Sequence, residues 1–140
     1  MIEIKFQNLG KGIVPKYMTP GAVGADLYAA ETVTIFSQDI VSIKTDIALE
    51  IPEGFEGQVR PRSSLFKKMG LLSPVGTIDQ DFRGNIEVVI MNVNQQRLVV
   101  IKEGERIAQL VIVPVCKVVF KEDKLSSTDR GAGGFGSTGK

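Results

Sequence analysis

The stretch RIAQLVIVPV, from Arg106 to Val115, is rich in β-branched residues and has no 3.6-residue repeat, which indicates a buried β-strand. The stretch NIEVVIMNV, from Asn85 to Val93, has the same character. Neither stretch is cleanly amphipathic, so both are predicted to be buried on two faces. A chain of 140 residues has little interior for so much two-sided burial, and the two strands therefore favour an oligomer.

Shorter strand-like segments continue this pattern along the chain, with turn signals rich in Gly, Pro and Asn between them. The stretch SSLFKKM, from Ser63 to Met69, is predicted to be helical over about two turns. The pattern favours an all-β sandwich, jelly roll or barrel with one short helix after Arg62. The shorter strand segments are IEIKF (2–6), VTIF (33–36), IVSIKTDIALEI (40–51), EGQVR (56–60), RLVVI (97–101) and KVVF (117–120).

Composition limits the chemistry that the chain can perform. Seventeen Lys and Arg residues against sixteen Asp and Glu residues leave a net charge of +1, so no general attraction to nucleic acid or membrane is expected. There is no histidine, which excludes Ser-His-Asp catalysis and His-ligated zinc. The single cysteine, Cys116, lies in an apolar run and is predicted to be a small core residue. Catalysis would therefore need carboxylates, hydroxyls, cationic side chains, backbone amides or a hard cation.

The chain is predicted to form one β domain, residues 1–120, followed by an arm without its own core, residues 121–140. No apolar run is long enough to cross a bilayer, and no signal-peptide pattern opens the sequence. These features predict a soluble intracellular protein, cytoplasmic by default, with a nuclear or viral origin left open.

The arm ends in TDRGAGGFGSTGK, from Thr128 to Lys140, which contains the spacing G-x-x-x-x-G-K. A P-loop also needs a following helix and a Ser or Thr after the lysine, and both are missing from this sequence. A flexible polar tail is one alternative. The other is a phosphate-binding arm, because Phe135 lies between two glycines with Arg130 before it and Ser137 and Thr138 after it. Such a segment could wrap a phosphate chain while the ring stacks on a base.

The stretch VGTIDQDFRG places two carboxylates, Asp79 and Asp81, on one side of a strand or turn. This spacing suits metal or phosphate-water chemistry, and it equally suits an acidic hairpin turn. Asp79 follows the apolar residues VGTI directly, so it is expected to be partly desolvated. A shielded carboxylate of this kind can act as a general base toward water.

Three further segments carry candidate polar residues. In RPRSSLF, Arg62, Ser63 and Ser64 at a helix start form either an anion site or an ordinary serine N-cap. Asp26 follows a glycine-rich turn, where an Asx-turn and a functional role are both open. Gln109 lies inside an apolar strand, so its amide needs partners from the backbone or from a ligand.

Taken in order, these segments resemble the five motifs of the trimeric dUTP pyrophosphatases, or dUTPases. The likeness spans nearly the whole chain, and five motifs in order are far more specific than one. The motifs are GADLYAA (24–30), PRSSL (61–65), GTIDQDFRG (76–84), GERIAQLV (104–111) and RGAGGFGSTG (130–139).

The resemblance implies a dUTPase-like β jelly roll that assembles as a homotrimer, with active sites between subunits and the C-terminal arm closing over a neighbour's site. It implies hydrolysis of dUTP to dUMP and pyrophosphate by water attack at the α-phosphorus. This reaction removes dUTP and supplies dUMP for dTMP synthesis. Magnesium would be the cofactor, held mostly through the substrate and water.

The resemblance also implies residue roles. Asp79 would orient or deprotonate the attacking water, and Asp26 would lie near the magnesium through water without being a firm ligand. Backbone groups from Gly76 to Ile78 would pair with uracil and exclude the thymine methyl. Phe82 would lie against deoxyribose, and Phe135 would stack on uracil. The other substrate-binding residues would be Arg62, Ser63, Ser64, Gln109, Arg130, Gly136, Ser137 and Thr138.

The sequence departs from the dUTPase pattern at two positions. Phe82 stands where the family usually has tyrosine, so the ring is kept and its hydroxyl is lost. Ser64 stands where glycine is usual, a substitution shared with the related dCTP deaminases. That sister family carries a glutamate at the position of Val89, so this chain lacks the deaminase proton carrier. A non-enzymatic nucleotide-sensing module on the same scaffold is a further alternative.

Overall fold

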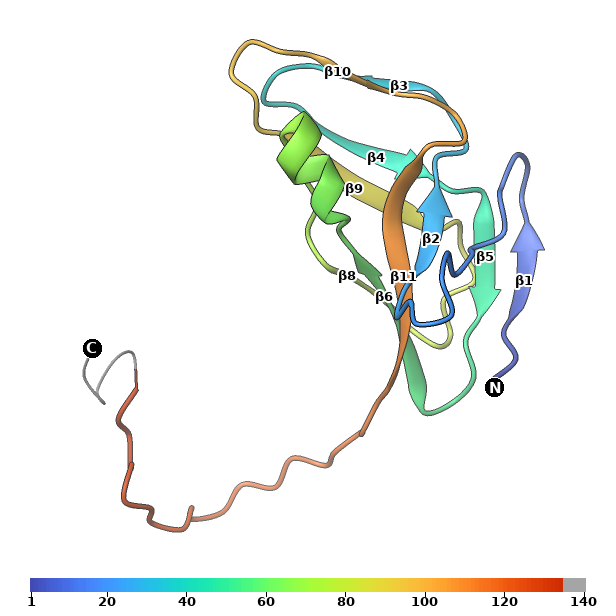
Figure 1. Ribbon diagram of the computed structural model, residues 1–140. Helices are drawn as coiled ribbons and strands as arrows, with labels where there is room; N and C mark the ends of the chain where they lie inside the picture. The colour runs from blue at the N-terminus through green and yellow to red at the C-terminus, as the bar shows by residue number, and fades with distance from the viewer. Residues whose placement is uncertain (135–140) are drawn as a thin grey trace.

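The chain forms short antiparallel strands that wrap around one apolar core in the computed structural model, which describes residues 1–134 (Figure 1). The strands are β1 (Lys5–Asn8), β2 (Ala25–Tyr28), β3 (Val33–Ile35), β4 (Ile40–Lys44), β5 (Ile47–Glu50), β6 (Phe55–Arg60), β7 (Leu71–Leu72), β8 (Gly76–Ile78), β9 (Glu87–Asn92), β10 (Val99–Ile101) and β11 (Arg106–Pro114).

Within the described residues the strands pair in four small sheets, ordered β2-β11-β6-β8, β4-β9-β7, β1-β5 and β10-β3. Every named strand pair is antiparallel, and neighbours in a sheet are often far apart in sequence. This arrangement confirms the all-β jelly roll predicted from the strand pattern.

The strand β6 is central to the largest sheet because it pairs with β11 on one side and with β8 on the other. Gln109 of β11 lies opposite Arg60, at the end of β6. Ile78 of β8 lies opposite Gly57, near the start of β6. Gln109 and the residues that follow Ile78 therefore lie near opposite ends of β6.

Burial along the two long strands differs from the sequence prediction. Strand β9 alternates strictly, with Val88 and Ile90 fully buried and Val89 exposed, so one of its faces is open to solvent in the single chain. In β11, Ile107 and Ala108 are both buried because the register with β2 shifts between Arg106 and Ala108. Such a bulge places two successive side chains on the core side.

The core is mainly aliphatic, and among its few polar residues Asn92 joins distant segments. The Asn92 side chain is fully buried and donates hydrogen bonds to the carbonyls of Ile35 and Arg97, at 3.0 and 2.8 Å. Its carbonyl accepts from the backbone amide of Asn94, at 3.0 Å. The buried amide is thus fully paired, as burial of a polar group requires.

The predicted helix is present, with a different geometry. Ser63 and Ser64 are helical, and the turn widens into a π-type segment, η1 (Leu65–Met69), that ends at Gly70. Gly70 adopts a left-handed φ of 64°, which favours glycine at that position.

Two predictions near the end of β11 were wrong. Cys116 is exposed and not a core residue. The segment KVVF forms no strand, and its residues Val119 and Phe120 are 95% and 94% exposed. The composition is that of a strand, but residues 1–134 of the single chain offer this segment no pairing partner.

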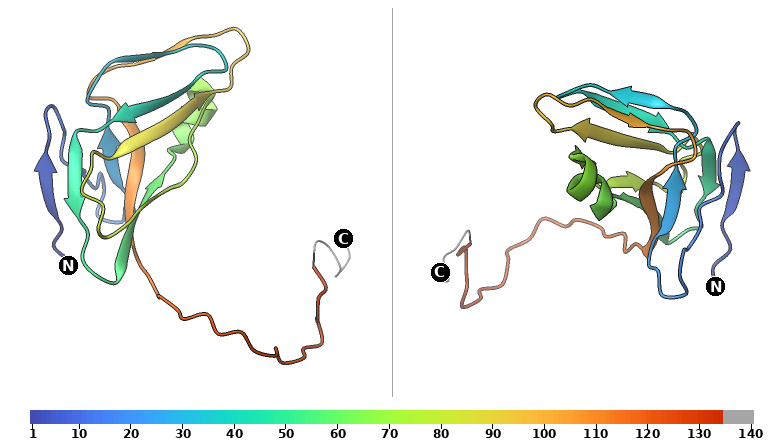
Figure 2. Two further views of the ribbon diagram at one scale, coloured as in Figure 1. Left: turned by 180° about the vertical axis from the view of Figure 1, so that it is seen from behind. Right: turned by 45° about the horizontal axis from the view of Figure 1, so that its top comes forward.

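The chain after β11 leaves the body of the domain, as two further views show (Figure 2). The amide of Val115 still donates to the carbonyl of Gly54, at 2.8 Å. Beyond it, the hydrogen bonds of residues 116–134 are local to that segment. Phe135, Gly136, Ser137 and Thr138 lie outside the described residues. Among residues 1–134, no helix is both long and apolar enough to span a membrane.

Candidate functional site

A cavity of about 360 Å³ lies beside β8 and the turn that follows it. Within the described residues β8 pairs with a neighbour on one side only, so its outer edge keeps backbone N–H and C=O groups available for a ligand. Predicted site residues from the third motif gather here. The cavity is lined by Val59, Gly76, Thr77, Ile78, Asp79, Phe82, Asn85, Ile86 and Glu87.

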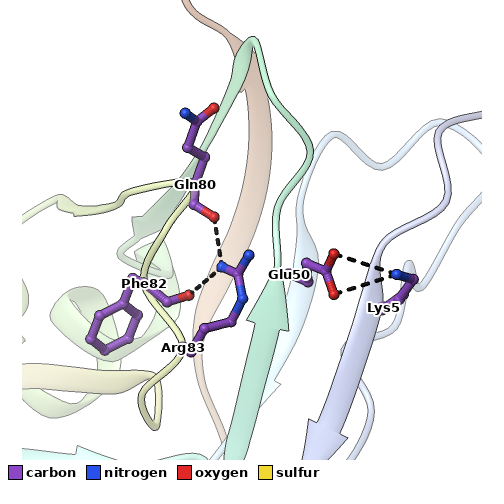
Figure 3. Close-up of polar contacts among 5 residues, drawn as sticks. All are labelled: Lys5, Glu50, Gln80, Phe82 and Arg83. Atoms are coloured by element: carbon purple, nitrogen blue, oxygen red, sulfur yellow. Dashed lines mark hydrogen bonds and ion pairs between the residues drawn. The ribbon is translucent and has the colours of Figure 1, made fainter.

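The turn from Asp79 to Asn85, here called the Asp79 turn, is held by its own backbone and by one arginine. The amide of Phe82 donates to the carbonyl of Asp79, at 3.1 Å. The Arg83 side chain folds back and donates from Nη1 to the carbonyls of Gln80 and Phe82, at 2.6 and 3.0 Å (Figure 3). These charge-assisted bonds fix the shape of the turn that carries both Asp79 and Phe82.

The ring of Phe82 lies over Gly84. A β-carbon at Gly84 would lie 2.6 Å from Cζ of Phe82, a distance that real atoms do not adopt. Phe82 lines the cavity and is 43% exposed, so one part of the ring remains available for contact. Glycine at position 84 is therefore what lets the ring occupy this place.

The Asp79 carboxylate is exposed in the single chain, which differs from the expected partial desolvation. It lines a second cavity of about 330 Å³ together with Asp81 and Glu56. The strand ends at Ile78, and the turn carries Asp79 beyond the sheet and into solvent. Residues 1–134 of the single chain do not shield this carboxylate.

A second group of predicted residues surrounds Asp26, which lies within β2 and is only 2% exposed. Arg62 Nε lies 3.5 Å from Asp26 Oδ1, and Arg106 Nη1 lies 3.1 Å from Asp26 Oδ2. Arg62 also donates from Nη1 to the carbonyl of Arg106, at 3.2 Å. These three residues, called the arginine cluster below, place two cations around one buried carboxylate. Asp26 therefore positions arginines, and the Asx-turn interpretation was wrong.

The arginine cluster opens into a cavity of about 460 Å³ at the start of η1. Ser64 lines this cavity and makes no side-chain capping hydrogen bond, so the N-cap interpretation does not account for its hydroxyl. Ser63 precedes it and is exposed. The full lining is Tyr28, Arg62, Ser64, Leu65, Lys68, Met69, Gly104, Glu105 and Arg106. Its cationic and hydroxyl groups suit an anion.

Gln109 belongs to this side of the sheet. It lies opposite Asp26 on one neighbouring strand and opposite Arg60 on the other. A β-carbon at Gly24 would lie 2.8 Å from the β-carbon of Gln109, so glycine permits the close approach of these two segments. The Gln109 side chain is partly exposed.

The two groups of residues lie far apart in one chain. Asp79 follows Ile78 and so lies near the level of Glu56, four residues from Arg60 along β6. At about 3.3 Å per residue this separates Asp79 from the level of Gln109 by about 13 Å. The order β8-β6-β11-β2 adds three strand spacings, or about 14 Å, between β8 and Asp26. One chain therefore does not bring its own Asp79 and its own arginine cluster together.

The described part of the arm stands apart from both groups. Arg130 Nε donates to the carbonyl of Gly133, at 2.9 Å, and the amide of Gly131 donates to the Thr128 hydroxyl, at 3.1 Å. These bonds make a local turn. The arm runs away from the body of the domain (Figure 1), and Arg130 lines neither the cavity beside β8 nor the cavity at η1.

Metal-binding groups are sparse in the described part of the chain. Residues 1–134 contain no cluster of three or more acidic or cysteine side chains that could hold a metal ion. Asp26 Oδ1 is buried and accepts no hydrogen bond from residues 1–134, although Arg62 lies near it. A single buried oxygen of this kind does not form a protein cage for the ion.

Sequence reasoning did not single out three residues that the fold brings to these sites. Arg106 pairs with Asp26 across 80 positions, Arg83 holds the Asp79 turn, and Asn85 lines the cavity beside β8. Arg106 and Arg83 both stand inside motifs, so their position was a signal. Their partners depend on strand register, which the motifs do not state.

Comparison with known proteins gives a consistent result. A model of the dUTPase family matches residues 10–139. The deoxyuridine 5'-triphosphate nucleotidohydrolase of Hydrogenobaculum sp. is 50% identical over 130 residues, covering 90% of this chain and 90% of that protein. The protein of the same name from Anaplasma marginale is 42% identical, covering 99% of each.

Solved structures of dUTPases are also similar to this chain. The Staphylococcus bacteriophage 80alpha dUTPase with dUPNHPP superposes with a TM-score of 0.91 at 31% identity, covering 100% of both chains. A mutant dUTPase from phage phi11 of S. aureus, described with a structural Mg(II) ion, gives a TM-score of 0.84 at 28% identity. That match covers 89% of this chain and 98% of the phage chain.

Replacing Gly84 with alanine should displace the Phe82 ring, because the new methyl carbon would lie only 2.6 Å from Cζ of the ring. We expect the KM for the substrate that occupies this cavity to rise by about 10-fold, with little change in thermal stability. Gly21→Ala is the matched control, since nothing lies within 4 Å of its added carbon. Steady-state kinetics of both variants would check this, and equal KM values for Gly84→Ala and wild type would contradict it.

Proposed function

The chain belongs to the dUTPase family and hydrolyses dUTP, and we propose that each active site combines the Asp79 turn of one copy with the arginine cluster of another. The observation that carries this proposal is the separation of the two groups across the sheet β2-β11-β6-β8. A water held by Asp79 must lie beside the α-phosphorus. The β- and γ-phosphates of that nucleotide are then too close to Asp79 to reach the arginine cluster of the same chain.

Exposed apolar surface supports assembly of several copies. Val118, Val119 and Phe120 are 63%, 95% and 94% exposed on a segment that pairs with no strand in the described part of the chain. Contiguous apolar surface of this kind usually marks a protein interface. We propose a homotrimer in which each arm reaches a site built mainly by its neighbours, and in which the assembly covers the exposed Asp79.

The cavity beside β8 is the proposed site for the base and sugar. Free backbone groups on the outer edge of β8, from Gly76 to Ile78, can pair with the polar edge of uracil. Cytosine would present a mismatched edge, and the 5-methyl group of thymine would meet the cavity wall. One methyl group is worth only about 1–3 kcal/mol, so hydrogen bonding is the stronger selector. Phe82 packs on deoxyribose and leaves no room for a 2'-hydroxyl.

The proposed reaction is an in-line displacement by water. The Asp79 carboxylate orients the water and accepts its proton as the oxygen bonds to the α-phosphorus. The bond between the α-phosphorus and the bridging oxygen breaks, which yields dUMP and pyrophosphate. The exposed position of Asp79 at the end of β8 leaves room for a water between the carboxylate and the phosphate.

The partner's arginine cluster and the arm hold the phosphates in this proposal. Arg62, Ser63, Ser64 and Gln109 contribute from the neighbouring body. Arg130, Gly136, Ser137 and Thr138 contribute from the arm, while Phe135 stacks on uracil and closes the site to bulk water. The Asp26 carboxylate keeps the two arginines in place, because it pairs with both of them.

Magnesium is the proposed cofactor. Residues 1–134 offer no cluster of metal ligands, so the ion would be held mostly through the substrate and water, with Asp26 near it and not a firm ligand. When bound, magnesium gathers the triphosphate oxygens and neutralises the charge that develops on the leaving pyrophosphate.

Replacing Asp79 with asparagine should lower kcat for dUTP by about 10²- to 10⁴-fold, because the amide cannot accept the proton of the attacking water. Pyrophosphate release with magnesium present would measure this. Asp39→Asn is the control, since it changes an exposed carboxylate in the turn between β3 and β4. An Asp79→Asn variant that kept wild-type turnover would remove Asp79 from the reaction.

A chain ending at Thr128 should keep its assembly and lose activity by roughly 10²-fold, because the arm orders the phosphates without supporting the core. Size-exclusion chromatography and dUTP kinetics would separate these two effects. A chain ending at Gly139 is the control for shortening the terminus. Normal turnover by the shorter chain would show that the arm takes no part in closing the site.

A further inference from the structure

Asn85 joins the cavity beside β8 to a carboxylate that lies outside it. Asn85 lines the cavity together with Asp79 and Phe82. Asn85 Nδ2 donates to Asp46 Oδ1 at 2.8 Å, and the amide of Asp46 donates to Asn85 Oδ1 at 3.0 Å. Two reciprocal bonds fix both the position and the orientation of the Asn85 amide.

Asp46 is itself held in place from the other side. The amide of Lys11 donates to Asp46 Oδ2, at 3.0 Å, and the amide of Leu9 donates to the Asp46 carbonyl, at 2.8 Å. A β-carbon at Gly10 would lie 2.6 Å from Asp46 Oδ2, so the loop closes tightly on the carboxylate. The Lys11 amide, followed by the Asn85 side chain, lowers the pKa of Asp46 below its usual value. The charged form is therefore the one that these contacts favour.

The backbone around this pair continues the connection into β9. The amide of Thr45 donates to the carbonyl of Ile86 at 3.0 Å, and the amide of Ile86 donates to the carbonyl of Ile47 at 2.9 Å. Asp46 adopts a φ of 52°, in the left-handed region that aspartate, asparagine and glycine tolerate best. The corner between β4 and β5 is thus hydrogen-bonded to the end of the Asp79 turn, and Arg83 is hydrogen-bonded to carbonyls in the middle of that turn.

We propose that Asp46 is a positioning residue for nucleotide binding, which acts through Asn85 to hold the wall of the base cavity. This inference rests on the proposed placement of uracil in that cavity. Asp46 does not line the cavity, and its carboxylate oxygens face Asn85 and the loop at Lys11. Its effect therefore reaches the substrate by way of Asn85.

The test compares dUTP kinetics of Asp46→Gly, Asn85→Ala and the double variant. Glycine keeps the left-handed backbone at position 46 and removes both side-chain contacts. We expect KM to rise by about 10-fold in each single variant, with kcat within about 3-fold of wild type. Because Asp46 acts through Asn85, the double variant should be no worse than Asn85→Ala alone.

Glu50→Gln is the matched control on β5, because it removes a carboxylate from an exposed ion pair with Lys5 and leaves Asn85 untouched. It should match wild type. Asparagine tolerates the same backbone at position 46, but its NH₂ group would face one of the two donors that Asp46 now accepts from. We therefore expect Asp46→Asn to have a KM between those of wild type and Asp46→Gly. This variant keeps the test available if Asp46→Gly fails to fold.

The possible failures point to different parts of the account. If Asp46→Gly leaves KM unchanged while Asn85→Ala raises it, Asp46 has no positioning role. If the two single effects multiply in the double variant, Asp46 does not act through Asn85. If neither Asn85→Ala nor Gly84→Ala alters KM, the cavity beside β8 does not bind the base, and the proposed site is wrong at that point.

Discussion

The pairing of β6 with β8 on one side and β11 on the other is the constraint on which the proposed site depends. Antiparallel register fixes Ile78 opposite Gly57 and Gln109 opposite Arg60. A shift by one residue would turn Gly57 and Val59 out of the core and their polar neighbours into it. The apolar core therefore enforces the register, and the register keeps the Asp79 turn and the arginine cluster at opposite ends of the sheet.

The two separated groups of residues supply different chemical groups. The Asp79 turn supplies a carboxylate, an aromatic ring and free backbone groups beside a cavity, while the arginine cluster supplies positive charge around Asp26. The turn is fixed by Arg83 and by the Asp46–Asn85 pair, so its groups are ordered before a ligand arrives. Preorganised groups lose little conformational entropy on binding, which favours a site assembled from rigid parts of different copies.

Much of the fold was predictable from short-range patterns. Alternating apolar residues and turn signals predicted most of the strands, and Ser63 to Met69 was predicted to be the short helix. The short strands β2, β7 and β8 were not predicted, and the segment predicted over residues 40–51 is divided into β4 and β5. Long-range partners were not predictable, since the Asp26–Arg106 ion pair and the Asp46–Asn85 pair depend on strand register over 80 and 39 positions. KVVF has a strand composition but no partner strand among residues 1–134, so the local pattern alone predicted the wrong structure there. The motif residues could be identified from the sequence, whereas their separation into two distant groups follows only from the order of strands in the sheet.

The most direct measurement of the shared site mixes two inactive variants, Asp79→Asn and Arg62→Gln, under conditions that exchange subunits. In a symmetric oligomer whose sites combine these residues from different copies, about a quarter of the sites in an equal mixture regain both native residues. The account predicts that dUTP hydrolysis by the mixture rises to about this fraction of wild-type activity. A mixture no more active than either variant alone would show that Asp79 and Arg62 do not act together across copies, and would contradict the central claim.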